Sequence, residues 1–171
     1  MKKIYIILLL IFSVFIITGC EDEKDVVISG GEKVNVSKMG HKHCTRTASA
    51  DDGIDVNLYY DLYYKDEDLL LLVSVEEISS TNEENLDTYE DAYNGIKANY
   101  AGLEYYDQEV IRTDNLVTNK ITINYEKIDV DKLLAIEGEE DNIIVDGKAK
   151  LDSWITLGKK FGVKCEEVTE E

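Results

Sequence analysis

The chain has 171 residues and is strongly acidic: 36 Asp and Glu against 18 Lys and Arg give a net charge of −18 at pH 7. Apolar residues make up 44% of the chain, which is enough for a hydrophobic core and excludes an acidic disordered protein. The charge argues against nucleic acid as a partner, because phosphate binding requires a basic surface. It also argues against a domain that lies flat on anionic lipid head groups.

The first 20 residues have the layout of a bacterial lipoprotein signal. Two lysines follow Met1, residues 4–17 carry no charge, and the sequence Ile-Thr-Gly-Cys ends the segment at Cys20. A positive head, an apolar run and small residues before a cleavage point are typical of secretory signals, and the cysteine makes this one a lipobox. We therefore predict a signal peptide at residues 1–19 and a diacylglycerol group on the Cys20 sulfur.

The alternative is an uncleaved transmembrane helix that happens to end at a cysteine. As a helix the uncharged run would be about 21 Å long, whereas a bilayer requires roughly 20 apolar residues. The lipoprotein interpretation is preferred. It places the protein on the extracytoplasmic face of the cell membrane, in the outer leaflet of the plasma membrane if the cell is Gram-positive.

Residues 20–43 are predicted to be the lipidated cysteine followed by a flexible tether, because they mix charge with a glycine pair. About 23 flexible residues would span roughly 25 Å, enough to lift a domain clear of the head groups. The short apolar segments 26–28 and 34–36 could each add an edge strand, so this boundary stays open. The globular domain is predicted to span residues 44–171.

The first half of the domain is predicted to form three strands and then a helix. A short strand at 44–49 and a tight turn precede residues 54–64, where apolar side chains alternate with polar ones, as in a half-buried strand. Residues 69–78 are expected to supply a matching apolar face through Leu69, Leu71, Val73 and Val75. Thr81 and Glu84 have the spacing of a capping box. The apolar stripe of the helix that follows has the spacing of a core face, not of a cofactor slot: Leu86, Tyr89, Tyr93, Ile96 and Tyr100.

The second half contains strands at 105–113 and 116–127, a connector at 129–136 and an acidic loop at 137–142. A second helix at 148–161 and a final strand at 163–168 complete the chain. The order βββαββαβ predicts an α+β, two-layer fold, in which two helices pack on one face of an antiparallel sheet.

The segment Lys120–Leu134, KITINYEKIDVDKLL, is an alternating strand that runs into a Leu pair. Together with residues 86–137 and the helix and strand of 148–168, it resembles the YehR-like family of small bacterial lipoproteins. The lipobox and the hairpin before the first helix occur in the same order. The resemblance implies an α+β two-layer domain. The function of that family is not established, so the resemblance implies no catalytic or binding residues.

Candidate metal sites in the sequence are weak. His41 and His43 would point to one side of a strand and Cys44 to the other, so the three potential ligands do not converge. The acidic loops lack the alternating ligand spacing of a calcium loop and are expected to be solvated. No metal or other cofactor is therefore predicted.

Enzyme motifs are missing from the sequence: it contains no GxSxG, HExxH, CxxC or Gly-rich phosphate loop. Both histidines lie at the edge of the domain, which disfavours a catalytic triad. We predict that the protein is not an enzyme.

One candidate binding surface stands out on the strand at 54–64. The side chains that face away from the predicted core are those of Asp55, Asn57, Tyr59, Asp61 and Tyr63. Aromatic rings with acids on an open sheet face suit a sugar, a peptide or a cationic partner. The alternative is that tyrosine is simply a good strand former that covers neighbouring strands.

Cys44 and Cys165 are the two thiols that remain once Cys20 is lipidated, and export brings them to a compartment where disulfides persist. A bond between them would require the first and last strands to be neighbours, since the Cα atoms must lie within about 7 Å. Two separate buried thiols are the alternative.

The expected function is that of a lipid-anchored, non-catalytic binding or accessory module of the cell envelope. Its expected partners are the membrane, through the lipid on Cys20, and an envelope protein, and the domain is expected to be monomeric. Two alternatives stay open: a metal- or solute-capturing lipoprotein that serves a membrane transporter, and a cell-envelope hydrolase with an unrecognised site.

The lipobox generates a direct test. Radiolabelled palmitate is expected to label the wild-type protein, which fractionates with membranes, and not the Cys20→Ala variant, because the acyl chains need the Cys20 sulfur. Equal labelling of the two proteins would contradict the prediction.

Overall fold

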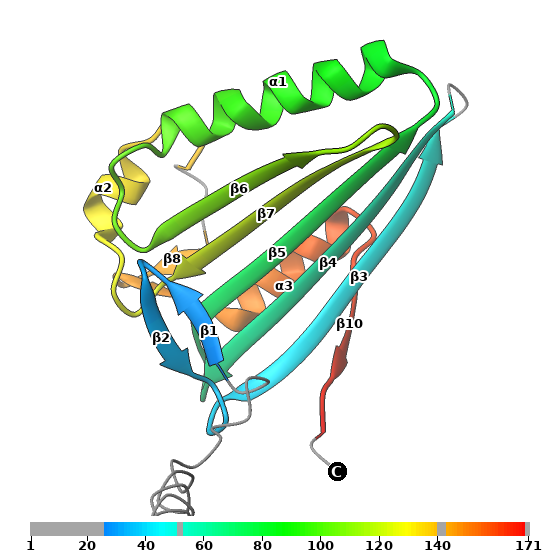
Figure 1. Ribbon diagram of the computed structural model, residues 1–171. Coiled ribbons are helices and arrows are strands. Elements are labelled where there is room, and N and C mark those ends of the chain that lie inside the picture. The colour runs from blue at the N-terminus through cyan, green and yellow to red at the C-terminus, as the bar shows by residue number, and fades with distance from the viewer. Residues whose placement is uncertain (1–25, 51–52, 140–142, 170–171) are drawn as a thin grey trace, which may run out of the picture.

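The computed structural model describes residues 26–50, 53–139 and 143–169 (Figure 1). Its centre is a six-stranded sheet in which every neighbouring pair is antiparallel. In spatial order the strands are β10 (Lys164–Glu167), β3 (Gly40–Ala50), β4 (Ile54–Lys65), β5 (Asp68–Ser80), β7 (Leu116–Asn124) and β6 (Tyr106–Arg112). The helices are α1 (Glu83–Asn99), α2 (Val130–Leu134) and α3 (Leu151–Lys160), and two small hairpins pair β1 (Val26–Ser29) with β2 (Glu32–Asn35) and β8 (Ile144–Val145) with β9 (Lys148–Ala149).

The predicted fold class is confirmed, and the sheet strands with α1 and α3 follow the order βββαββαβ. Alternate residues of β4 pack on both helices: Ile54 lies in a core cluster with Leu86 of α1, and Leu62 lies in a second cluster with Leu151 of α3. Residues eight apart on a strand share a face, so both helices cover the same side of the sheet. In Figure 1, α3 lies behind β4 and β5, while α1 runs along the β6 side.

The helix ends differ from the predicted ones. Asn82, not Thr81, caps α1: its side-chain oxygen accepts a hydrogen bond of 3.0 Å from the backbone N–H of Glu84. Helix α3 ends at Lys160, so Phe161 follows the helix and is 61% exposed instead of joining the core. The predicted connector contains α2 as a third, short helix.

The predicted apolar face of β5 is wrong in register. A β-bulge between Tyr63 and Tyr64 pairs these residues with Leu71 and Leu69, so Leu70 is an extra residue in β5. An extra residue reverses which face the following side chains occupy. Consequently Leu69 and Leu72 pack in the α3 cluster. Leu71, Val73 and Val75 lie on the opposite face, in register with the predicted surface residues of β4.

The folded part of the chain begins before Cys44, inside the segment predicted as a tether. The β1–β2 hairpin packs against the end of the β6–β7 pair, where the N–H of Gly30 donates to the Asp107 carboxylate at 2.6 Å. Gly30 has φ +58°, and a Cβ there would lie 2.6 Å from the Tyr105 ring, so only glycine fits this approach. Glu32 of β2 pairs with Lys127. Hence the part of residues 20–43 from Val26 onward belongs to the fold.

The membrane-related predictions concern the start of the chain. The predicted signal peptide at residues 1–19 and the lipid site Cys20 lie outside the described residues. Within the described ranges, no helix combines the length and the apolar character needed to cross a bilayer.

A disulfide joins Cys44 and Cys165, as predicted. The two residues lie directly opposite each other in the β3–β10 pair, with their Cα atoms 3.9 Å apart. The first and last strands of the main sheet are therefore neighbours. Cys44 is fully buried in the α3 core cluster.

Removal of this bond is expected to destabilise the domain. The bond closes a loop with a sequence separation of 121 residues, so we expect the Cys44→Ala/Cys165→Ala variant to lose about 2–5 kcal/mol of unfolding free energy in urea titrations. Thiol counting on the denatured, unreduced wild type is expected to find both cysteines blocked. Two titratable thiols in that sample would contradict the bond.

Candidate functional site

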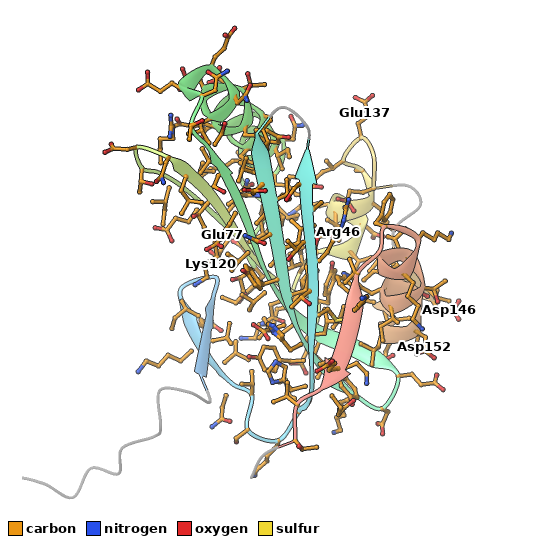
Figure 2. All side chains as sticks on the ribbon, turned by 90° about the vertical axis from the view of Figure 1, so that its right-hand side faces the viewer. Arg46, Glu77, Lys120, Glu137, Asp146 and Asp152 are labelled. Atoms are coloured by element: carbon orange, nitrogen blue, oxygen red, sulfur yellow. A yellow bond between two sulfur atoms is a disulfide. The ribbon has the colours of Figure 1, made fainter. Side chains whose placement is uncertain are left out.

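The five predicted surface residues share one face of β4, because they alternate with Ile54, Leu58 and Leu62, which are buried on the side that carries α1 and α3. We call the side of the sheet that faces away from α1 and α3 the open face. Figure 2 shows this side to the left of the strands, where Glu77 and Lys120 are labelled, while α3 lies to the right.

The two histidines also lie on the open face, and both contact Asp61. Nε2 of His41 and Nδ1 of His43 are each 2.9 Å from the same carboxylate oxygen, Oδ1. The His41 ring stacks on Tyr63, with 4.5 Å between centroids. Cys44 points to the other side of β3, as the alternation predicted. In the ranges that the structure describes, no group of three His, Cys, Asp or Glu side chains is arranged to hold a metal ion.

Other groups on the open face also have partners within the fold. Asp55 accepts a hydrogen bond of 2.5 Å from the Ser49 hydroxyl. Leu71 and Thr122, which also lie on this face, are buried. The β1–β2 hairpin lies in front of one end of the sheet (Figure 1). The structure thus brings the five predicted residues together on one face, where Asp61 contacts both histidines and Asp55 accepts a hydrogen bond from Ser49.

A hollow of about 250 Å³ opens on the other side of the sheet, between α3 and strands β3 and β4. A second hollow of about 390 Å³ adjoins it and shares Trp154, Leu157 and Phe161. We call the two hollows the α3 groove. Its lining residues are Arg46, Leu58, Tyr60, Tyr125, Gly138, Glu139, Ile143, Trp154, Leu157, Gly158, Phe161 and Val163.

The outer wall of the groove comes from one stripe of α3. Trp154, Leu157, Gly158 and Phe161 are spaced by three, one and three residues, which places them on the same side of a helix. The Trp154 ring meets Tyr60 edge-on, at 5.0 Å between centroids. A Cβ at Gly158 would lie 3.4 Å from that ring, so the glycine keeps the space beside Trp154 open. Leu157 and Phe161 are 40% and 61% exposed.

A row that contains three polar side chains and Leu58 crosses the sheet beside the groove; we call it the polar row. Arg46, Leu58, Glu76 and Asn119 are successive neighbours across β3, β4, β5 and β7. Gln108 donates to the side chain of Asn119 at 2.7 Å, which satisfies one of these buried groups. This row lies between the core cluster under α1 and the cluster under α3. The covered face is therefore apolar at both ends and polar in the middle.

Glu76 is the acid in that row, and burial raises its pKa above the ordinary value of 4.5. Tyr93 and then Arg46 oppose this shift, with smaller effects. Burial also raises the pKa of Tyr93, and the charge of Glu76 adds to the rise. The Tyr93 hydroxyl is buried without a hydrogen-bond partner among the described residues, so it lies near Glu76 without donating a well-formed bond.

The chain has two arginines, and their surroundings differ. Arg112 lies near two carboxylates of α1, Asp87 at 3.5 Å and Glu90 at 3.6 Å. Arg46 lines the groove, and no carboxylate oxygen of the described residues lies within 4.0 Å of it, although it is near enough to Glu76 to affect the pKa of that carboxyl. Figure 2 shows Arg46 on the α3 side of the sheet. The groove thus combines aromatic walls with one guanidinium group.

The α3 groove was not predicted from the sequence. Its only signal was the apolar spacing of the helix predicted at 148–161, and that spacing is equally typical of a buried core. The exposed positions of Leu157 and Phe161 become visible only in the folded chain.

Among solved structures, the fold is similar to that of the YehR protein of E. coli, determined by NMR. The TM-score is 0.53 at 18% sequence identity, and the match covers 78% of this chain and 95% of YehR. A protein from Streptococcus pneumoniae TIGR4, also solved by NMR, is 17% identical, with a TM-score of 0.47 and coverage of 82% of this chain and 90% of that one. No family model and no curated protein matches the chain. The likeness to YehR shows a shared fold and is consistent with the family resemblance seen in the sequence.

The buried position of Glu76 predicts a pH-dependent effect on stability. Because the folded-state pKa is raised, the fold favours the protonated acid, and its contribution to stability is lost as the pH rises through that pKa. Glu76→Gln is therefore expected to be more stable than the wild type at pH 8 in urea titrations, with a gain that shrinks as the pH falls to 5. Glu77→Gln, on the open face, is the matched control. A gain that is constant with pH would contradict the prediction.

Proposed function

We propose that the protein is a lipid-anchored, extracytoplasmic binding module of the cell envelope, which holds a ligand in the α3 groove and catalyses no reaction. The groove is the observation that carries the proposal. Leu157 and Phe161 expose apolar surface at its rim, and Trp154 and Tyr60 line its interior. Exposed apolar side chains around a concave site with few polar groups are characteristic of ligand-binding surfaces.

The anchoring part of the proposal is supported by the lipobox at Cys20 and by the disulfide. A bond such as Cys44–Cys165 persists in an oxidising compartment and is rare in the cytosol. Export and lipidation account for both features.

The non-catalytic part is supported by the chemistry of the lining. The described lining residues are mostly aromatic and aliphatic, and none of them is Ser, Cys or His. The two charged side chains are those of Arg46 and Glu139, and the Glu139 carboxylate accepts a hydrogen bond from Tyr100. A hydrolytic site would need a nucleophile or an activated water next to a base. The lining is suited to holding an apolar ligand.

Ligand retention by the groove is testable without knowing the ligand. The protein is purified from its own envelopes, and the small molecules that copurify are extracted and compared with those of a Leu157→Asp/Phe161→Asp variant. We expect at least one compound to be enriched several-fold in the wild type, because two charges at the rim disrupt apolar contact. Both positions are substantially exposed, so the variant is expected to keep its fold and its disulfide.

Ile111→Asp provides the matched control. Ile111 is 45% exposed but belongs to β6, away from the groove lining. Its extract is expected to equal that of the wild type. Identical extracts from all three proteins would count against the groove as a binding site.

A further inference from the structure

We propose that the α3 groove binds a small amphipathic carboxylate, whose carboxylate meets the Arg46 guanidinium and whose aromatic body packs against Trp154 and Phe161. This inference rests on the proposed function and adds to it the chemical class of the ligand. It follows from the charge distribution, the lining and the size of the groove.

The charge of Arg46 is the first argument. In a chain with 36 acidic residues, an arginine that lines an apolar hollow has no carboxylate of the described chain within 4.0 Å. The guanidinium group presents a planar pair of N–H donors that matches a carboxylate, and the bond is strengthened where water is partly excluded. An external carboxylate would complete the pairing that Arg112 already has within the fold.

The two ends of the groove differ in charge, which fixes the orientation of the ligand. Arg46 lines the hollow next to β3, whereas Glu139 lines the adjoining one and accepts a hydrogen bond from Tyr100. A negative head is therefore favoured at the Arg46 end and opposed at the Glu139 end, so the uncharged body of the ligand points toward Glu139.

The lining and the volume indicate the body of the ligand. Tyr60, Trp154 and Phe161 present aromatic surfaces, and ring pairs gain energy in offset or edge-on contact. The hollow beside Arg46 holds about 250 Å³, which is below the roughly 300–1,000 Å³ of pockets that enclose drug-sized ligands. A single ring on a short alkyl chain fits this space better than a long acyl chain or a protein segment.

Trp154 is the only tryptophan of the chain, so its fluorescence reports directly on the groove. The full-length protein is reconstituted in phosphatidylcholine vesicles and titrated with 4-phenylbutyrate or with its neutral amide, 4-phenylbutyramide. The two compounds share one body and differ in the charge of the head. We expect saturable changes in Trp154 emission, with the carboxylate binding at least tenfold more tightly than the amide.

Arg46→Gln is expected to abolish the preference for the carboxylate, whereas Arg112→Gln, the other arginine, is expected to keep it. Phe161→Ala removes a ring that is 61% exposed, so the fold is expected to persist. This variant should weaken both compounds equally and retain the preference. If Arg46→Gln does not fold, the Phe161→Ala variant still tests whether the ligand body packs in the groove.

Two results would overturn the inference. One is equal affinity for carboxylate and amide in the wild type, and the other is an unchanged preference in folded Arg46→Gln. In either case a saturable response to the amide, or a compound enriched from native envelopes, would leave the groove intact as a binding site. Absence of any response, together with identical envelope extracts, would remove both the inference and the proposed function.

Discussion

The pairing of β10 with β3 is the constraint on which the α3 side of the molecule depends. β10 is a strand of four residues at the edge of the sheet, and the Cys44–Cys165 bond fixes it there. Glu167 adds polar contacts by accepting hydrogen bonds from Lys42 and Tyr64, and these contacts lower its pKa. Because a short turn joins α3 to β10, fixing the strand also holds the helix across β3 and β4.

The position of α3 in turn creates the groove and divides the core. The helix covers Leu62 and Leu72 at one end of the sheet, while α1 covers Ile54 and Ile78 at the other. Between them the sheet carries the polar row, in which Asn119 is buried and Glu76 is only partly buried. The α3 groove and the polar row thus have the same cause: the two helices cover opposite ends of a single sheet face.

Strand β4 and helix α1 could be predicted because their apolar residues recur at the fixed spacing of a strand or a helix. Alternation along β4 and the spacing of Leu86 and Tyr93 determine which sides are buried, whatever the details of packing. The bulge at Leu70 could not be foreseen, since the run of four leucines from Leu69 is apolar on both faces and leaves the register open. The β1–β2 hairpin depends on distant contacts of Gly30 that leave no local pattern.

The same distinction applies to the two surfaces. The open face follows directly from alternation, so its five residues could be listed in advance. The α3 groove joins residues near Leu58 with residues near Trp154, and its rim exists because α3 ends at Lys160, one residue before the apolar stripe does. That Arg46 forms no ion pair with the described carboxylates likewise depends on where those side chains lie in space, which no sequence pattern shows.

The β1–β2 hairpin changes how far the domain can travel from its proposed lipid anchor. With β1 packed on the sheet from Val26 onward, five residues separate the folded unit from Cys20. The six Cα–Cα steps from Cys20 to Val26 reach about 20 Å when fully extended. This connecting segment is short compared with the domain, so the domain would stay within a thin layer above the bilayer. Compounds that concentrate at the head-group surface would meet it far more often than compounds free in the surrounding medium.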